Sequence, residues 1–200
     1  MNTDASSNAT ECSTPSIALV IIDQQAGIDH PKLGERNNPK AEAHMLRLLA
    51  LWRGLGYPVI HVKHRSTDPD SVFWPGQDGC NFKPEFEPIP GEQVIEKSVP
   101  CAFTNNSLQS TLESLGTHEL AIVGVATNNS VESTARTACN LNLKAYVVED
   151  ACYTFAKRDH FGHPRSAMDV HAMSLANLHG EYATVVTCAE LERIAKVIGR

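Results

Sequence analysis

Three polar residues of complementary chemistry lie where apolar segments end. Asp23 closes the apolar run at residues 16–22, Lys97 ends a short segment at residues 93–97, and Ser130 follows the run at residues 120–123. Each alone has an ordinary explanation, as a turn former, a solvated lysine or a helix cap. Together, a carboxylate, an ammonium and a hydroxyl are the groups that acyl transfer requires, if one crevice gathers them.

The surroundings of Ser130 favour a strand followed directly by a helix. Apolar residues fill positions 120–123, and apolar residues at positions 131, 135, 138 and 139 recur with helical spacing. Unpaired backbone N–H groups at the start of a helix favour negative charge. A nucleophile at this position would therefore have a site for the oxyanion that forms when it attacks a carbonyl.

The other segments alternate between strand and helix patterns. Further strands are expected at residues 58–62, 143–149 and 182–186, and a helix at residues 166–178 that carries the apolar residues Met168, Val170, Ala172, Met173 and Leu175. We expect Asn38 to cap the first helix, with Pro39 at its first position. The alternation predicts an α/β fold with three α/β/α layers around a six-stranded, mostly parallel sheet. Residues 1–15 are predicted to be a disordered tail, followed by one domain at residues 16–200.

Composition excludes several classes of function. The net charge is −6 and no Lys/Arg cluster occurs, which argues against nucleic acid or an anionic membrane as a partner. No apolar run reaches the length of a membrane span. The six cysteines are scattered and form no CxxC pair, which predicts a cytoplasmic protein without disulfides or structural zinc.

Three segments resemble the signature segments of the isochorismatase-like cysteine hydrolases. They are residues 21–25 (IIDQQ), residues 96–98 with Ala102 and Phe103, and residues 124–136 (GVATNNSVESTAR). Residues 148–152 and the final strand and helix are also similar, so the resemblance covers nearly the whole chain from Ile17. It implies a Rossmann-like fold, a homo-oligomer (dimer or tetramer), and an Asp–Lys–Cys triad whose thiolate attacks an amide-type carbonyl of a small-molecule substrate.

Carried over residue by residue, the resemblance makes Asp23 the general base and Lys97 the supporting ammonium. It implies a cis peptide bond between Val125 and Ala126, and an oxyanion hole formed by the backbone N–H groups of Ala126 and Ser130. For the aromatic residues in nearby loops, packing beneath the loops or at a subunit contact is the alternative to substrate contact. The residues that we expect to contact substrate are Gln25, Trp74, Phe103, Asn129, Tyr153 and Phe155.

Ser130 stands where the family usually has its cysteine. A thiol, with a pKa of about 8.5, ionises far more readily than a serine hydroxyl, which normally needs a dedicated base. The chain is therefore an engineered Cys→Ser form, a natural serine variant with its own chemistry, or a non-catalytic binding or assembly protein on the same fold. In the family, hydrolysis of the isochorismate vinyl ether does not need the cysteine, so Asp23 could then supply the proton while Lys97 holds a carboxylate.

A metal site is not expected. Nicotinamidase-like relatives carry an Asp-Trp-His-Pro segment for a divalent ion, and residues 62–69 of this chain lack it. His61 and His64 alone do not complete a set of ligands. We predict neither a metal nor another cofactor.

Overall fold

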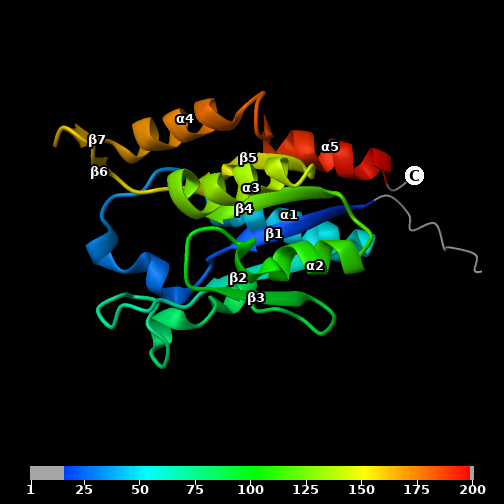
Figure 1. Ribbon diagram of the computed structural model, residues 1–200, viewed down its shortest axis with the longest axis horizontal. Coiled ribbons are helices and arrows are strands. Elements are labelled where there is room, and N and C mark those ends of the chain that lie inside the picture. Colours follow the sequence, from blue (N-terminus) through cyan, green and yellow to red (C-terminus); the bar gives the residue numbers. More distant parts are fainter. Residues whose placement is uncertain (1–15, 199–200) are drawn as a thin grey trace, which may run out of the picture.

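Six parallel strands form one sheet in the computed structural model, which describes residues 16–198 (Figure 1). The predicted tail at residues 1–15 lies outside the described residues. The strand order is β3-β2-β1-β4-β5-β8. The predicted α/β class is confirmed, and the sheet is parallel throughout. The strands are β1 Ile17–Ile22, β2 Val59–His64, β3 Gln93–Lys97, β4 Glu119–Val125, β5 Lys144–Tyr153 and β8 Thr184–Val186.

Helices cover both faces of this sheet and complete the three layers (Figure 1). α1 (Ala41–Leu55) and α5 (Cys188–Ile198) pack on one face, and α2 (Ser107–Ser114), α3 (Glu132–Asn140) and α4 (Ala167–Leu178) lie on the other. A small antiparallel hairpin, β6 (Lys157–Arg158) with β7 (Pro164–Arg165), extends beyond the sheet. No helix within residues 16–198 is long and apolar enough to cross a membrane. Short 3-10 turns occur at Ala26–Asp29, Pro31–Leu33, Asp78–Cys80, Pro84–Phe86 and Thr104–Asn106.

The central strand β1 explains why the sheet is buried on both faces. Its alternate residues Ile17, Leu19 and Ile21 join the core under α1 and α5, and the residues between them join the core under α2 and α3. Parallel strands covered on both faces read as continuous apolar runs, as residues 17–22 do. The run therefore predicts the strand, and the strand delivers Asp23 to the carboxyl edge of the sheet.

Gly124 permits the closest approach between β1 and β4. It pairs with Ile22, and a Cβ atom at this position would clash with the carbonyl oxygen and the amide nitrogen of Ile22. Its φ of 121° is also one that other residues rarely adopt. A glycine is therefore required one residue before the end of β4, beside the strand that leads to Asp23.

The role predicted for Asn38 is wrong, and β5 is longer than expected. The helix starts at Ala41, after the N-cap residue Lys40. The Asn38 amide instead donates to the carbonyl oxygens of Glu149 (2.8 Å) and Cys152 (2.7 Å). These two residues flank an irregularity in the β4–β5 pairing, beyond which β5 continues to Tyr153. Local sequence signals do not reveal such a bridge, because its two ends are more than a hundred residues apart. The last strand, β8, is shorter than predicted.

The predicted helix at residues 166–178 is present as α4, but its largest apolar side chains are exposed. Met168 and Met173 are 54% and 64% exposed, whereas the polar residues His171 and Ser174 are buried. Ser166 caps the helix by a reciprocal pair of hydrogen bonds with Asp169. The helix is oriented by polar contacts on its inner face, so the positions of its largest apolar residues do not predict which side is buried.

Candidate active site

The carboxyl ends of β1, β3 and β4 bring Asp23, Lys97 and Ser130 together. Asp23 follows β1, Lys97 is the last residue of β3, and Ser130 lies in a π-helical turn, Thr127–Val131, between β4 and α3. The Lys97 Nζ is 2.8 Å from the Asp23 Oδ2, and the Ser130 Oγ donates to the same oxygen at 3.0 Å. The Lys97 Nζ also donates to the Ser130 Oγ at 3.3 Å. The three side chains thus form a closed triangle of hydrogen bonds.

These three residues are removed from water, which changes the acidity of the carboxyl group. None of them is more than 5% exposed. Burial raises the pKa of Asp23, and the charge and hydrogen bond of Lys97 and the hydrogen bond of Ser130 oppose that rise without cancelling it. A carboxylate with a raised pKa is a stronger proton acceptor than an ordinary one. This is the property that a general base for a serine hydroxyl needs.

Only one oxygen of Asp23 is used within the triangle. Oδ2 accepts from both Lys97 and Ser130, whereas the buried Oδ1 has no hydrogen-bond partner among residues 16–198. The backbone of Asp23 has a φ of 54°, in the left-handed region that is uncommon for residues with a side chain. Such conformations are concentrated at functional sites, where the surrounding structure enforces them.

His64 is a fourth polar side chain at this edge, and its position in the sequence had suggested only a metal ligand. Its Nδ1 lies 3.3 Å from the Lys97 Nζ. Burial, with a further contribution from the Lys97 charge, lowers the pKa of His64 to about 4. The ring is therefore neutral at pH 7 and can accept a hydrogen bond. Alternate residues of a strand lie on the same face, and this alternation could have placed His64. His64 is the last residue of β2 and shares a face with Ile60 and Val62.

The two histidines of β2 do not form a shared metal site. They are three residues apart, so their side chains leave the strand on opposite faces. The His61 Nε2 lies 2.8 Å from the Glu92 Oε2, away from His64. Within the described part of the chain, no group of three or more His, Cys, Asp or Glu side chains is arranged to hold a metal ion. The absence of a metal or cofactor stays a prediction.

The turn that carries Ser130 is held from both sides. The Val125–Ala126 peptide bond is cis, and the Ala126 carbonyl accepts from the backbone N–H groups of Asn129 (3.0 Å) and Val131 (3.2 Å). Buried polar groups of α4 secure the outer side. The His171 Nδ1 lies 2.8 Å from the Thr127 Oγ1, and the Ser174 Oγ donates to the Thr127 carbonyl at 3.0 Å. Sequence reasoning missed these contacts because they join segments more than 40 residues apart.

Gln25 is fully buried and holds two strands together. Its Nε2 donates to the carbonyl oxygens of His64 and Cys80, both at 2.9 Å, and its Oε1 accepts from the backbone N–H of His64 at 2.7 Å. Both amide protons are therefore used inside the protein. These contacts tie the segment after β1 to the end of β2. They leave neither amide proton of Gln25 for the substrate contact that was predicted for it.

The other predicted substrate contacts are dispersed. Phe103 is buried in the core under α2 and α3, whereas Tyr153 is fully buried on the opposite side of the sheet, with the Arg36 guanidinium 3.4 Å from its ring centre. Phe155 packs edge-on against Tyr153. Trp74 is 38% exposed and Asn129 is exposed. The structure does not bring the four aromatic side chains into one group.

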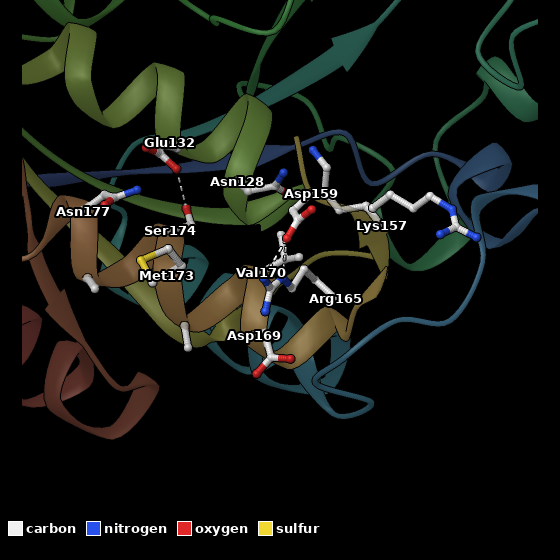
Figure 2. Close-up of a pocket in the computed structure, with 13 residues that line it drawn as sticks. Asn128, Glu132, Lys157, Asp159, Arg165, Asp169, Val170, Met173, Ser174 and Asn177 are labelled. Atoms are coloured by element: carbon white, nitrogen blue, oxygen red, sulfur yellow. Dashed lines mark hydrogen bonds and ion pairs between the residues drawn. The ribbon is translucent and has the colours of Figure 1, made fainter. Parts of the chain in front are cut away.

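A separate groove beside α4 has a volume of about 720 Å³ (Figure 2). None of the three central polar residues lines it. Its walls come from α4, the β6–β7 hairpin, Asn128 and Glu132, and the hydrogen bond from Ser174 to Glu132 (2.7 Å) closes one side. Its Arg165 is paired with Asp159. The one hydroxyl side chain among its lining residues, Ser174, is hydrogen-bonded to Thr127 and Glu132, so we take the buried triangle and not this groove as the candidate active site.

Comparisons with known proteins find similarity over most of the chain. The isochorismatase domain model matches residues 17–190. The isochorismatase family protein YrdC of Bacillus subtilis is 37% identical over 174 residues, which cover 87% of this chain and 93% of YrdC. Nicotinamidase 3 of Arabidopsis thaliana is 26% identical over 88% of this chain and 87% of its own length. A solved isochorismatase-family structure from Chromobacterium violaceum superimposes with a TM-score of 0.87 at 46% identity, covering 91% of this chain and 94% of that one.

Proposed function

Because the chain belongs to the isochorismatase family of hydrolases, we propose that it cleaves an amide-type C–N bond of a small molecule at Asp23, Lys97 and Ser130. The observation that carries the proposal is the closed triangle of hydrogen bonds among these side chains, with no side longer than 3.3 Å. The similarity to a nicotinamidase supports an amide as the substrate class.

The first half of the reaction follows from the donors and acceptors of the triangle. As the Ser130 Oγ attacks the carbonyl carbon, its proton passes to the Asp23 Oδ2, to which it is already hydrogen-bonded at 3.0 Å. The carbonyl oxygen becomes an oxyanion, which the backbone N–H groups of Ala126 and Ser130 would stabilise. Lys97 donates to the Oγ and compensates the negative charge that develops there.

The second half returns the site to its starting state. When the tetrahedral intermediate collapses, the C–N bond breaks and the leaving nitrogen takes the proton from Asp23. A water molecule then attacks the acyl group on Ser130, and Asp23 accepts one of its protons. Collapse of this second intermediate releases the carboxylic acid and restores the Ser130 hydroxyl with the proton held by Asp23. One water is consumed, and one acid and one amine are formed.

Serine in place of cysteine lowers the expected rate but leaves the chemistry possible. A hydroxyl is much harder to deprotonate than a thiol. The raised pKa of Asp23 offsets part of this difference, because the carboxylate accepts the proton more readily. The same raised pKa suits a second candidate function, hydrolysis of a vinyl ether, in which Asp23 would donate the proton and Lys97 would bind a substrate carboxylate.

The experiment compares the unmodified chain, Ser130→Cys and Asp23→Asn on a panel of small amides, nicotinamide among them. Hydrolysis by the unmodified chain that disappears in Asp23→Asn supports the serine mechanism, and mass spectrometry should then detect an acyl group on Ser130. Hydrolysis by Ser130→Cys alone would identify a hydrolase site that serine has disabled. Hydrolysis by neither would favour the binding-protein alternative and contradict the proposal.

The remaining predictions extend this proposal. Contact of Trp74, Phe103, Asn129 and Phe155 with substrate stays a prediction, as does a homo-oligomeric state, which light scattering on the purified chain would measure. Tyr153 is withdrawn from the substrate contacts, because its ring is fully buried beneath Arg36. The cytoplasmic location also stays a prediction, and the five free cysteines within residues 16–198 are compatible with a reducing compartment.

A further inference from the structure

The Lys97 ammonium has three N–H donors, and three acceptors surround it. They are the Asp23 Oδ2 at 2.8 Å, the Ser130 Oγ at 3.3 Å and the His64 Nδ1 at 3.3 Å. The Lys97 side chain is only 1% exposed, so bulk water cannot replace any of them. The number of acceptor atoms around the ammonium therefore equals the number of its N–H donors. His64 supplies the acceptor that lies outside the triangle of Asp23, Lys97 and Ser130.

His64 is held in the orientation that this contact requires. Its backbone N–H and carbonyl both bind the Gln25 amide, at 2.7 and 2.9 Å. Its ring packs edge-on against Phe73, with 5.7 Å between ring centres. Because an ammonium can only donate, the Nδ1 must accept the hydrogen bond from Lys97. The proton of the neutral imidazole therefore lies on Nε2. Backbone, ring and protonation state are thus all fixed.

We propose that His64 is a positioning residue that fixes the Lys97 ammonium between Asp23 and Ser130, so that one N–H remains directed at the attacking atom. The proposal rests on the proposed function and extends it to a fourth side chain. His64 acts through Lys97, since its own hydrogen-bond contact is with the ammonium and not with the Ser130 hydroxyl.

The physical consequence concerns the acidity of the attacking group. Without an acceptor at position 64, one buried N–H of Lys97 loses its partner, which is unfavourable. The ammonium can recover a partner by moving closer to Asp23 and away from Ser130. The group at position 130 then loses positive charge that stabilises its ionised form, so that its pKa should rise.

A thiol introduced by Ser130→Cys reports this effect without any substrate. Its alkylation by iodoacetamide, followed by mass spectrometry of the peptide that contains position 130, gives a rate that depends on pH through the thiolate fraction. In this background, His64→Leu removes the acceptor and His64→Asn restores one near the place of Nδ1. His61→Leu is the matched control, because it makes the same substitution at a buried histidine of β2 whose side chain lies on the opposite face, away from Lys97.

We expect His64→Leu to raise the midpoint of the pH profile by about one unit, which corresponds to an about tenfold lower rate below that midpoint. His64→Asn should recover most of the rate, and His61→Leu should retain the parent midpoint. An unchanged midpoint in His64→Leu, or equal loss in His64→Asn and His64→Leu, would overturn the proposal. If His64→Leu does not fold, His64→Val replaces it as the variant without an acceptor. The same rise of the midpoint is then expected, and an unchanged midpoint in His64→Val would overturn the proposal.

This measurement is independent of the hydrolysis assay. A protein that cleaves no amide would still give a thiol titration, so failure of the proposed function leaves the result for His64 readable. Conversely, amide hydrolysis with an unchanged titration in His64→Leu would refute the role of His64 and leave the proposed function standing.

Discussion

Replacing Lys97 by methionine should destabilise the protein strongly, and more at neutral than at acidic pH. The side chains of Lys97 and Asp23 are 1% and 7% exposed, and their charged atoms are 2.8 Å apart. Removing one partner of a buried ion pair leaves an uncompensated charge and typically costs about 3–5 kcal/mol. We therefore expect Lys97→Met to lower the free energy of unfolding by about 3–5 kcal/mol at pH 8.

The pH dependence follows from the direction of the Asp23 shift. Its pKa is already raised by burial, and removing Lys97 also removes the attraction that opposes this rise. A folded-state pKa above the unfolded value means that the folded protein binds more protons, so stability falls as pH rises through that window. The variant has the higher Asp23 pKa and hence the wider window. Each additional unit is worth about 1.4 kcal/mol, so its deficit should be smaller at pH 5 than at pH 8.

His64 acts in the same direction. The Lys97 charge contributes to lowering the pKa of His64 to about 4, so its loss should let that pKa return toward its ordinary value. A depressed histidine pKa costs stability as the pH falls below the unfolded value. That cost should be smaller in Lys97→Met, which again reduces the deficit at acidic pH.

Urea denaturation followed by tryptophan fluorescence at pH 5, 6, 7 and 8 measures the difference between variant and parent. Lys144→Met is the matched control, because Lys144 forms an exposed pair with Glu119, with side chains 56% and 31% exposed. Such surface pairs contribute about 0–1 kcal/mol. The double variant Asp23→Asn with Lys97→Met should cost less than the sum of the single changes. A deficit for Lys97→Met as small as that of Lys144→Met, or one that grows toward pH 5, would refute the reasoning.

Three further predictions concern the supports of the site. Gly124→Ala should lower the free energy of unfolding by more than about 2 kcal/mol, because strain at a positive φ adds to a clash with β1. Gly54 is the control: it lies in a helix, and a Cβ atom added there would have no neighbour within 4 Å. In the same denaturation assay, Gly54→Ala should therefore be neutral or stabilising. Asn38→Ala should cost about 2–4 kcal/mol through the loss of two hydrogen bonds and strain at its φ of 47°, and Asn38→Gly should recover the strain part alone; equal costs would contradict this division. Ser174→Ala removes a hydrogen bond to the turn at Thr127–Val131, so it should lower the free energy of unfolding by only about 1–2 kcal/mol. It should also slow alkylation of the Ser130→Cys thiol. An unchanged alkylation rate would show that α4 does not hold this turn.

The residues of α4 differ strongly in their exposure to solvent. Met168 and Met173 of α4 are exposed, whereas His171 and Ser174 of the same helix are buried. The inner side contacts the turn of Ser130 through Thr127. Any contact that displaced α4 would therefore reach the candidate active site through these two hydrogen bonds.

Local sequence patterns were sufficient to predict the layers of the fold and the strand ends at which the three central polar residues lie. Runs such as residues 17–22 record burial on both faces of a parallel sheet, and parallel strands end at one common edge. Asp23 and Lys97 could therefore be assigned to that edge from local patterns alone. Ser130 followed from the strand-to-helix turn, because the change of period from strand to helix is also local.

Which side chains complete the site, and which support it, depends on contacts between distant segments of the folded chain. His64 contacts Lys97, Gln25 is used up between two strands, and Asn38 bridges an irregular part of β5 instead of capping a helix. The outward orientation of Met173 and the direction of the Asp23 pKa shift likewise depend on neighbours far along the chain. The periodicity of apolar residues indicates which positions are buried. A hydrogen bond between distant residues, or the burial of a charge, depends on two segments that meet only when the chain has folded.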